Sequence, residues 1–315
     1  MKNNNIMRTK IKLLVLCFFC FLFKGIGQNT NLDSLLDVQM KAKNQNTTQH
    51  TEATFKTSRL IDGHTVETTQ AGVLDLKVSH RFGQLNDGFY NMFGFDVASM
   101  RIGVDYGITN RFTIGGGRST FEKQYDGFLK YRLLWQSEGK KNVPVSVTLL
   151  SSVMLETDTL ALKTEKKISV SPSFANKLSY AYQVLIARKF NSNFSLQLAP
   201  TLIHENIVDS SFNPNDIFAL GFGARLKLTQ RSGINIEYYY QIPGTKLPGT
   251  YNTFSIGYEI ETGGHVFQLH FTNSTGMTER TFIAENKGRW NKGDIHFGFN
   301  ISRVFTIKKP KDLKM

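Results

Sequence analysis

Two histidines near the C-terminal end of the chain, His270 and His296, are the best-placed candidates for metal chemistry. Both fall on the polar side of consecutive predicted strands, and each lies close to the loop that joins those strands. Such residues can face one another across an antiparallel ladder, and two imidazoles with a carboxylate nearby suit a transition metal. Because the chain has no His-Glu-x-x-His pattern and no calcium-loop repeat, we favour the alternative that both histidines fill a polar interior.

Nucleophilic catalysis would need a serine and a histidine held together. Ser79 and His80 are neighbours in one predicted strand, and neighbouring strand residues point to opposite faces. A lipid hydrolase at the rim of a barrel would therefore need a serine from another strand and an orienting Asn or Asp, and nothing marks one. The run Gly115–Gly117 lacks the Lys-Ser/Thr of a phosphate loop. We expect no enzyme, no catalytic residue and no cofactor, with a rim hydrolase as the open alternative.

Charged residues on the polar side of alternating segments are the remaining candidates. They are the basic residues Lys77, Arg81, Arg101, Lys130, Arg132, Arg225 and Lys227 and the acidic residues Asp75, Asp105, Asp126, Glu237 and Glu259. Facing a barrel lumen, their small positive excess would favour anionic solutes if the lumen conducts. The alternative is a structural network of paired charges, because narrow barrels are filled by side chains whereas barrels of about sixteen strands leave a channel.

Strands must position these residues, and from Gly72 onward the chain alternates apolar with polar or small residues over segments long enough to cross a bilayer at a tilt. The apolar sides carry aromatic residues near their ends and the polar sides mix both charges with glycine, which favours a membrane barrel over a soluble sandwich. The alternation predicts about twelve strands, near residues 72–82, 98–108, 111–119, 124–135, 143–155, 177–188, 193–204, 216–228, 233–242, 253–261, 264–273 and 293–307.

The links between these segments alternate in length, which supports the same fold independently. Tight links such as 109–110, 189–192 and 229–232 alternate with long ones such as 156–175 and 273–292. Short turns face the periplasm in outer-membrane barrels, and an even number of strands returns both termini there. We therefore predict an all-β fold, a closed antiparallel up-and-down transmembrane β-barrel of the outer-membrane type. The first and last strands must pair, because an open edge is not tolerated in lipid.

The two ends of the 315-residue chain fall outside the predicted barrel. Residues 1–27 have the basic, apolar and small-residue order of a secretory signal peptide cleaved before Gln28, and they contain both cysteines. Residues 28–71 form a periplasmic or lumenal segment with a short hairpin at Asp62-Gly63. Residues 72–307 form the barrel, and residues 308–315 a basic periplasmic tail. Placing the hairpin in the wall would instead give about fourteen strands.

Several stretches of the sequence resemble an uncharacterised bacterial family of membrane-bound β-barrel domains. They are ATFKTSRLIDGHTVETT (53–69), HRFGQLNDGFYNMFGFD (80–96), VDYGITNRFTIGGGRS (104–119), YDGFLKYRLL (125–134), GGHVFQLHFTNSTGMTE (263–279) and HFGFNISRVF (296–305). The resemblance covers residues 53–307 and implies the barrel fold. It supplies no activity and no functional residues.

Two functions remain open at this point. One is a narrow channel or transporter for small, anionic solutes. The alternative is a non-conducting structural or interaction barrel that presents the loops 156–175 and 273–292 to partners. In either case we expect export to the bacterial outer membrane, contact with outer-membrane lipid, and assistance from periplasmic chaperones and the barrel-assembly machinery during biogenesis. We expect no nucleic-acid partner, and the oligomeric state stays undetermined.

Overall fold

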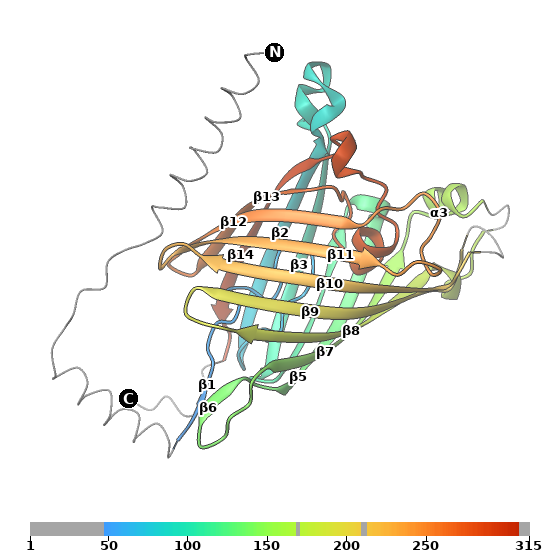
Figure 1. Cartoon of the computed structure of the whole chain (residues 1–315). Helices are drawn as coiled ribbons and strands as arrows, with labels where there is room; N and C mark the ends of the chain where they lie inside the picture. Colours follow the sequence, from blue (N-terminus) through green and yellow to red (C-terminus); the bar gives the residue numbers. More distant parts are fainter. Residues whose placement is uncertain (1–46, 168–170, 209–212, 309–315) are drawn as a thin grey trace, which may run out of the picture. The chain divides into compact units, whose positions relative to one another are not determined.

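The computed structural model describes residues 47–167, 171–208 and 213–308, and within these residues twelve antiparallel strands close into a barrel (Figure 1). The strands are β2 (Val73–Gln84), β3 (Ala98–Thr109), β4 (Phe112–Ser119), β5 (Gln124–Leu134), β7 (Ser146–Glu156), β8 (Leu178–Lys189), β9 (Phe194–Glu205), β10 (Asp216–Lys227), β11 (Ser232–Gln241), β12 (Thr253–Thr262), β13 (His265–Thr272) and β14 (His296–Thr306). The predicted fold and number of strands are confirmed. The expected signal peptide and all but Lys308 of the basic tail lie outside the described residues.

Each strand pairs with its neighbours in the chain, and the barrel closes between the first and last of the twelve. β14 pairs with β2 from Thr306–Val73 to His296–Gln84, with one irregularity between His296 and Gly298. This closure leaves no free strand edge, which a sheet surrounded by lipid cannot tolerate. Within the described part of the chain, no helix is long and apolar enough to cross a membrane.

The alternation in the sequence separates an outward and an inward face in every strand. In β3, Ile102 and Val104 are 47% and 41% exposed, whereas Arg101 and Asp105, which flank them, are 2% and 1% exposed. Successive side chains of a strand point to opposite faces, so the same period that exposes the apolar residues places the charged residues inside the barrel.

The two ends of the barrel differ in their connections. At one end, which we call the short-turn end, β3–β4, β8–β9, β10–β11 and β12–β13 are joined by tight turns. A two-stranded sheet of β1 (Thr48–His50) and β6 (Ser137–Gly139) also lies there, because β6 is part of the link from β5 to β7. The opposite end, the long-loop end, carries the link between β2 and β3 that projects at the top of Figure 1 and the short helix α3 (Thr159–Glu165).

Two segments outside the wall fill the lumen. Residues 54–66 are almost entirely buried, and so are residues 277–284 of the loop between β13 and β14, which include the one-turn π-helix η5 (Arg280–Ala284). Each segment brings apolar side chains into the interior. Phe55, Leu60 and Val66 pack on Leu185, Ala187 and Ala199 of β8 and β9. Phe282, Ile283 and Ala284 pack with Ile203, Ile217 and Tyr239 nearer the long-loop end.

Candidate functional site

The segment that enters the lumen from the short-turn end is a tight hairpin, residues 58–65, which we call the lumenal hairpin. Its arms meet through an antiparallel bridge between Arg59 and His64. The backbone N–H groups of Leu60 and Thr65 donate to the carbonyls of Gly63 and Ser58 at 2.8 and 2.9 Å. The sequence predicts this hairpin either in the periplasm or in the lumen, and in the structure it lies in the lumen.

The tip of the lumenal hairpin is held by a carboxylate of the wall. Glu237 on β11 accepts hydrogen bonds from the backbone N–H groups of Ile61, Asp62 and Gly63 at 3.0–3.3 Å. A Cβ atom on Gly63 would lie 2.0 Å from the hydroxyl of Tyr239, so a glycine is needed where the tip approaches β11. Converging N–H donors form a concave anion site, which here is satisfied by a side chain of the same chain.

A buried ion pair fixes the other side of the tip. The guanidinium of Arg81 on β2 lies 2.6 Å from the carboxylate of Asp62, and the two side chains are 0% and 1% exposed. Asn300 donates to the carbonyl of Ile61 at 2.9 Å, and Gln268 donates to that of Leu60 at 2.6 Å. The hairpin backbone is therefore satisfied by wall side chains, as a buried backbone must be.

The arms of the hairpin are held by two cations of β5. The ammonium of Lys130 donates to the carbonyls of Ser58, Thr65 and Glu67 at 3.0–3.1 Å. Arg132 donates to the carbonyl of Val66 at 3.1 Å and pairs with the Glu67 carboxylate at 2.8 Å. Five contacts thus tie the two arms to one strand.

A second cluster of wall charges lies beside Ser58. Lys77 forms ion pairs with Asp75 and with Asp105, the latter at 2.5 Å, and Ser58 donates to Asp105 at 2.5 Å. Arg101–Asp126 and Arg225–Glu259 are further pairs whose members both belong to the wall. The inward charges therefore serve two purposes: some pair within the wall, and others hold the hairpin.

The lumenal hairpin meets the loop from the long-loop end at one carboxylate. Glu279, which is 1% exposed, lies 3.6 Å from the Arg59 guanidinium and 3.3 Å from the His64 ring. Beyond it, Arg280 pairs with Glu156 at 2.8 Å and with Glu285 at 2.9 Å, and Lys166 pairs with Glu285 at 2.7 Å. These groups tie the loop to the wall and to the segment that follows α3.

Burial and opposite charges compete at this outer cluster. Burial alone would raise the pKa of Glu285, but Arg280 and Lys166 outweigh it and hold that pKa below its usual value. Burial would lower the pKa of Arg280 and of Lys166, but the surrounding glutamates raise both. All three groups are consequently charged at neutral pH, and the cluster is held together electrostatically.

Hollows lie at both ends of the barrel and beside the lumenal hairpin. A hollow of about 430 Å³ opens at the short-turn end around Lys56, Glu67 and His265. Beside the hairpin a space of about 30 Å³ remains near Arg59 and Asn300. At the long-loop end a hollow of about 130 Å³ adjoins Lys166 and Glu285. Residues of the lumenal hairpin line the first two of these hollows, and residues outside the strands line the last.

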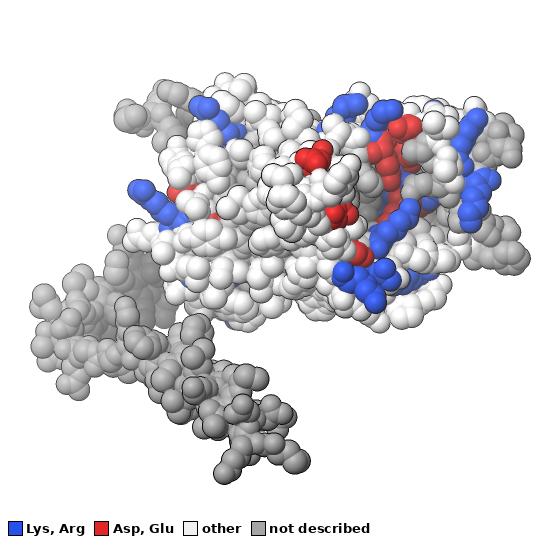
Figure 2. Space-filling model, turned by 90° about the horizontal axis from the view of Figure 1, so that it is seen from above, with Lys and Arg blue, Asp and Glu red and all other residues white. Residues whose placement is uncertain are grey.

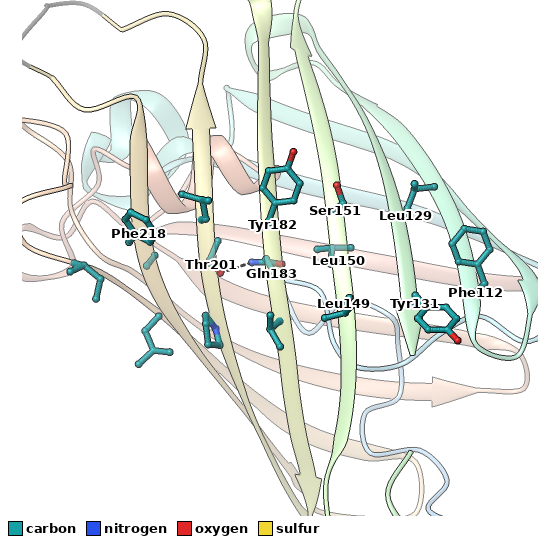
Figure 3. Close-up of a pocket in the computed structure, with 16 residues that line it drawn as sticks. Phe112, Leu129, Tyr131, Leu149, Leu150, Ser151, Tyr182, Gln183, Thr201 and Phe218 are labelled. Atoms are coloured by element: carbon teal, nitrogen blue, oxygen red, sulfur yellow. Dashed lines mark hydrogen bonds between the residues drawn. The ribbon is translucent and has the colours of Figure 1, made fainter. Parts of the chain in front are cut away.

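A further hollow lies on the outside of the barrel. Its volume is about 770 Å³, and it lies over β7, β8, β9 and their neighbours, with Leu129, Leu149 and Tyr182 around it (Figure 3). Viewed from above, most of the surface is uncharged, and acidic and basic side chains lie together in the right-hand part of the view (Figure 2). The outer wall around this hollow is thus apolar, and the inner wall carries the charged residues described above.

Comparison with known families matches residues 55–305 to the family described as "Membrane bound beta barrel domain (DUF5777)". The chain belongs to this family. Among curated proteins, none matches the chain.

Two porins and an outer membrane protein are among the solved structures to which the chain is similar, all at very low sequence identity. The NanC porin is 8% identical, with a TM-score of 0.45, over 74% of this chain and 98% of the other. The KdgM porin is 9% identical, with a TM-score of 0.44, over 74% and 99%. Omp33 of Acinetobacter baumannii is 6% identical, with a TM-score of 0.39, over 74% and 97%. The family match agrees with a membrane β-barrel.

The structure places the charged residues singled out in the sequence on the inward face. Ten are buried at 6% exposure or less, namely Asp75, Lys77, Arg81, Arg101, Asp105, Lys130, Arg132, Arg225, Glu237 and Glu259. The Asp126 side chain is 2% exposed, and Lys227, the last residue of β10, is half-buried. Five of them, Arg81, Asp105, Lys130, Arg132 and Glu237, bond directly to residues 58–67 in the contacts described above.

The expectation that His270 and His296 oppose one another is wrong by two residues. Gly298 lies opposite His270, and Thr272 lies opposite His296. The His296 ring bonds to the carbonyl of Phe82 and to Thr275 at 2.8 and 3.1 Å. No cluster of three or more His, Cys, Asp or Glu residues that could hold a metal ion occurs in the part of the chain that the structure describes.

Sequence reasoning missed the residues that complete the site from outside the wall. Asp62 and Glu67 of the N-terminal segment and Glu279, Arg280 and Glu285 of the last long loop belong to no alternating strand, so the inward pattern could not select them. The sequence of the last long loop did contain one indication that part of it is buried. Phe282-Ile283-Ala284 is an apolar run in an otherwise polar loop, and such a run is expected to be buried.

Proposed function

We propose that the protein is a gated channel of the outer membrane whose lumen is closed by its own lumenal hairpin. The observation that carries the proposal is the way the hairpin is held. It is a continuation of the N-terminal segment, not part of the wall, and polar side chains, not covalent links, keep it in place. The short-turn end, where the hairpin enters, is the periplasmic end by the usual arrangement of such barrels.

Displacement of the hairpin would change the electrostatics of the lumen. It would leave Arg81 without Asp62 and Arg132 without Glu67, while the ion pairs within the wall remain. Unpaired guanidinium groups facing water would attract anions, as rings of Arg and Lys do in anion-selective pores. Small anionic solutes are therefore the substrate class that we propose.

Conductance in planar bilayers tests this proposal. We expect the chain without its signal peptide to be almost silent, and a variant that lacks residues 53–69 to show discrete anion-selective conductance. A hairpin-deleted barrel that retains heat-modifiable gel mobility but passes no current would overturn the proposal. Arg132→Gln in the hairpin-deleted barrel should weaken the anion preference, and Arg225→Gln, which affects a pair within the wall, provides the matched comparison.

A second candidate, an interaction barrel, is favoured by the loop between β2 and β3. Phe89 and Tyr90 in this loop are 78% and 93% exposed, which is unusual for adjacent aromatic residues on a monomer. The loop 273–292, which the sequence suggested for this role, is unsuited to it because its central part lies inside the barrel. Two results together would support this candidate. The double variant Phe89→Ser/Tyr90→Ser would lose a binding partner that the parent protein retains, and the hairpin-deleted barrel would pass no current in planar bilayers.

A further inference from the structure

The inner wall holds the lumenal hairpin largely through groups that every peptide has. On β9, the Gln197 amide accepts from the backbone N–H of Val66 at 2.8 Å and donates to the carbonyl of His64 at 2.7 Å. On β11, the Glu237 carboxylate accepts only backbone N–H groups of the hairpin tip, within the part of the chain that the structure describes. These contacts depend on the backbone of the hairpin and not on its side chains, so another peptide of similar conformation can make them.

One contact at the hairpin tip depends on a side chain. The Asp62 carboxylate pairs with the Arg81 guanidinium at 2.6 Å, and water reaches neither group, since their side chains are 1% and 0% exposed. A guanidinium that is buried without a negative partner is costly, so this position of the wall selects an acidic group. The wall therefore recognises a combination, namely peptide backbone and one carboxylate.

The wall groups around the tip also orient one another. Arg81 donates to the carbonyl of His80 at 2.9 Å and to the amide oxygen of Asn300 at 3.2 Å. Asn300 in turn donates to the amide oxygen of Gln268, its cross-strand neighbour, at 2.8 Å. The three side chains lie on β2, β14 and β13, which are adjacent in the barrel. Because these bonds do not involve the hairpin, the groups stay preorganised for a ligand when the hairpin leaves.

We propose that these wall groups are the solute-binding site of the channel and that the site takes short acidic peptides. The hairpin then closes the lumen as a tethered copy of the solute. Asp62 supplies the carboxylate, and the backbone of residues 60–66 supplies the N–H and carbonyl groups. This inference rests on the proposed channel, because the site becomes accessible only when the hairpin leaves it, and it narrows the solute from small anions to acidic peptides.

Other small solutes leave part of this site unsatisfied once they have displaced water from it. An inorganic anion or a simple carboxylate pairs with Arg81 but brings no N–H donor to Glu237, and a buried carboxylate without a partner is costly. A neutral peptide satisfies Glu237 and leaves the Arg81 guanidinium without a negative charge. An acidic peptide satisfies both groups, as the hairpin does.

The test follows the hairpin in the full chain without its signal peptide. Residues 28–315 contain no cysteine, so Val66→Cys introduces a single thiol at a side chain that is 0% exposed while the hairpin is in place. Methyl methanethiosulfonate, a small neutral reagent, labels this thiol only when the hairpin leaves the wall. A ligand that binds the vacated wall shifts the population toward that state, so it accelerates labelling.

The probes are acetyl-Leu-Ile-Asp-Gly-amide, which has the sequence of residues 60–63, and the same peptide with Asn in place of Asp. A tethered segment competes at an effective concentration of about millimolar, so both peptides are titrated through that range. We expect the Asp peptide to accelerate labelling until it saturates, and the Asn peptide to need a roughly ten-fold higher concentration, the effect of one charge-assisted hydrogen bond. Sodium acetate should have no effect. Equal effects of the two peptides, including no effect of either, or an equal effect of acetate would overturn the proposal.

Arg81→Gln, combined with Val66→Cys, separates recognition of the carboxylate from simple loosening of the hairpin. Loosening alone raises the labelling rate without peptide and leaves the preference for the Asp peptide intact. We expect Arg81→Gln to raise that basal rate and also to make the two peptides equally effective. Arg225→Gln, which affects a pair within the wall, is the matched control and should keep the ten-fold preference. A preference that survives Arg81→Gln would overturn the proposal.

Planar-bilayer currents of the hairpin-deleted barrel distinguish a failure of this inference from a failure of the proposed channel. Selective acceleration of labelling by the Asp peptide, in a barrel that passes no current, would refute the channel and support the peptide site. An anion-selective current together with equal effects of the two peptides would refute the peptide site and support the channel.

Discussion

Replacing Lys130 with methionine should release the lumenal hairpin while leaving the wall intact. The methionine side chain has a similar length and no donor, so the carbonyls of Ser58, Thr65 and Glu67 each lose a hydrogen bond of 3.0–3.1 Å inside the barrel. A neutral hydrogen bond contributes about 1 kcal/mol net, so the three together contribute about 3 kcal/mol even if the charge of the ammonium is ignored.

The consequence for gating follows from that free energy. About 1.4 kcal/mol corresponds to a tenfold change in an equilibrium, so the ratio of open to closed barrels should rise about 100-fold. Planar-bilayer recording measures the ratio directly, as the frequency and duration of openings of the full chain without its signal peptide. Because the hairpin-deleted barrel defines the fully open conductance, the two effects can be compared on one scale.

Arg225→Met is the matched control, since Arg225 pairs with Glu259 of the wall at 2.5 Å and Glu259 keeps a second partner in Asn235 at 2.7 Å. We expect this variant to gate like the parent. An unchanged open ratio for Lys130→Met, in a barrel whose hairpin deletion does conduct, would refute the argument that these bonds keep the lumen closed. Equal increases in both variants would point to general loosening of the wall.

Three further changes test other parts of the same site. Gly63→Ala should raise the ratio of open to closed barrels as Lys130→Met does, because the Cβ of the alanine would lie 2.0 Å from the Tyr239 hydroxyl. Tyr239→Phe, which removes that hydroxyl, should partly reverse the increase. An unaltered ratio for Gly63→Ala would contradict the tight approach of the hairpin tip to β11. Acidification should free the loop 273–292, because the pKa of Glu285 in the folded protein is lowered. The ion pairs of the Glu285 carboxylate therefore stabilise the loop fully above the ordinary glutamate pKa of about 4.3. This stabilisation is lost as the pH falls through the lowered pKa of the folded protein. Hydrogen exchange of the backbone amides of that loop measures its release, and protection that stays unchanged down to about pH 3 would contradict the role of Glu285. Arg280→Met should raise exchange of the same loop at neutral pH by leaving Glu285 without one of its two cations, whereas equal protection would assign the loop's stability to its apolar residues alone.

The strands could be predicted because period-two alternation determines both the element and the face. A shift of one residue would expose the whole charged set to lipid, so the register of β3 follows from Arg101 and Asp105 alone. The predicted boundaries 98–108 compare with Ala98–Thr109 in the structure. The predicted starts at 143 and 293 are the least accurate, because the observed strands begin at Ser146 and His296.

The contents of the lumen could not be predicted in the same way. The partners of the hairpin tip lie on β2 and β11, and Glu237 follows Gly63 by 174 residues. No periodicity of the sequence connects such positions; they meet only because the barrel closes. The error in the histidine pair has the same origin, since the loop length did not determine where pairing between β13 and β14 begins.

The two segments in the lumen are not independent of one another. Glu279 of the loop from the long-loop end faces Arg59 and His64 of the hairpin, and its own side chain is 1% exposed. Withdrawal of the hairpin therefore leaves a buried carboxylate without its cation, which is costly unless water enters. The same step that opens the short-turn end thus favours hydration or movement of the loop that closes the other end. A barrel closed by two segments that share one charge is expected to open at both ends together, and its conductance should show one open level and not two.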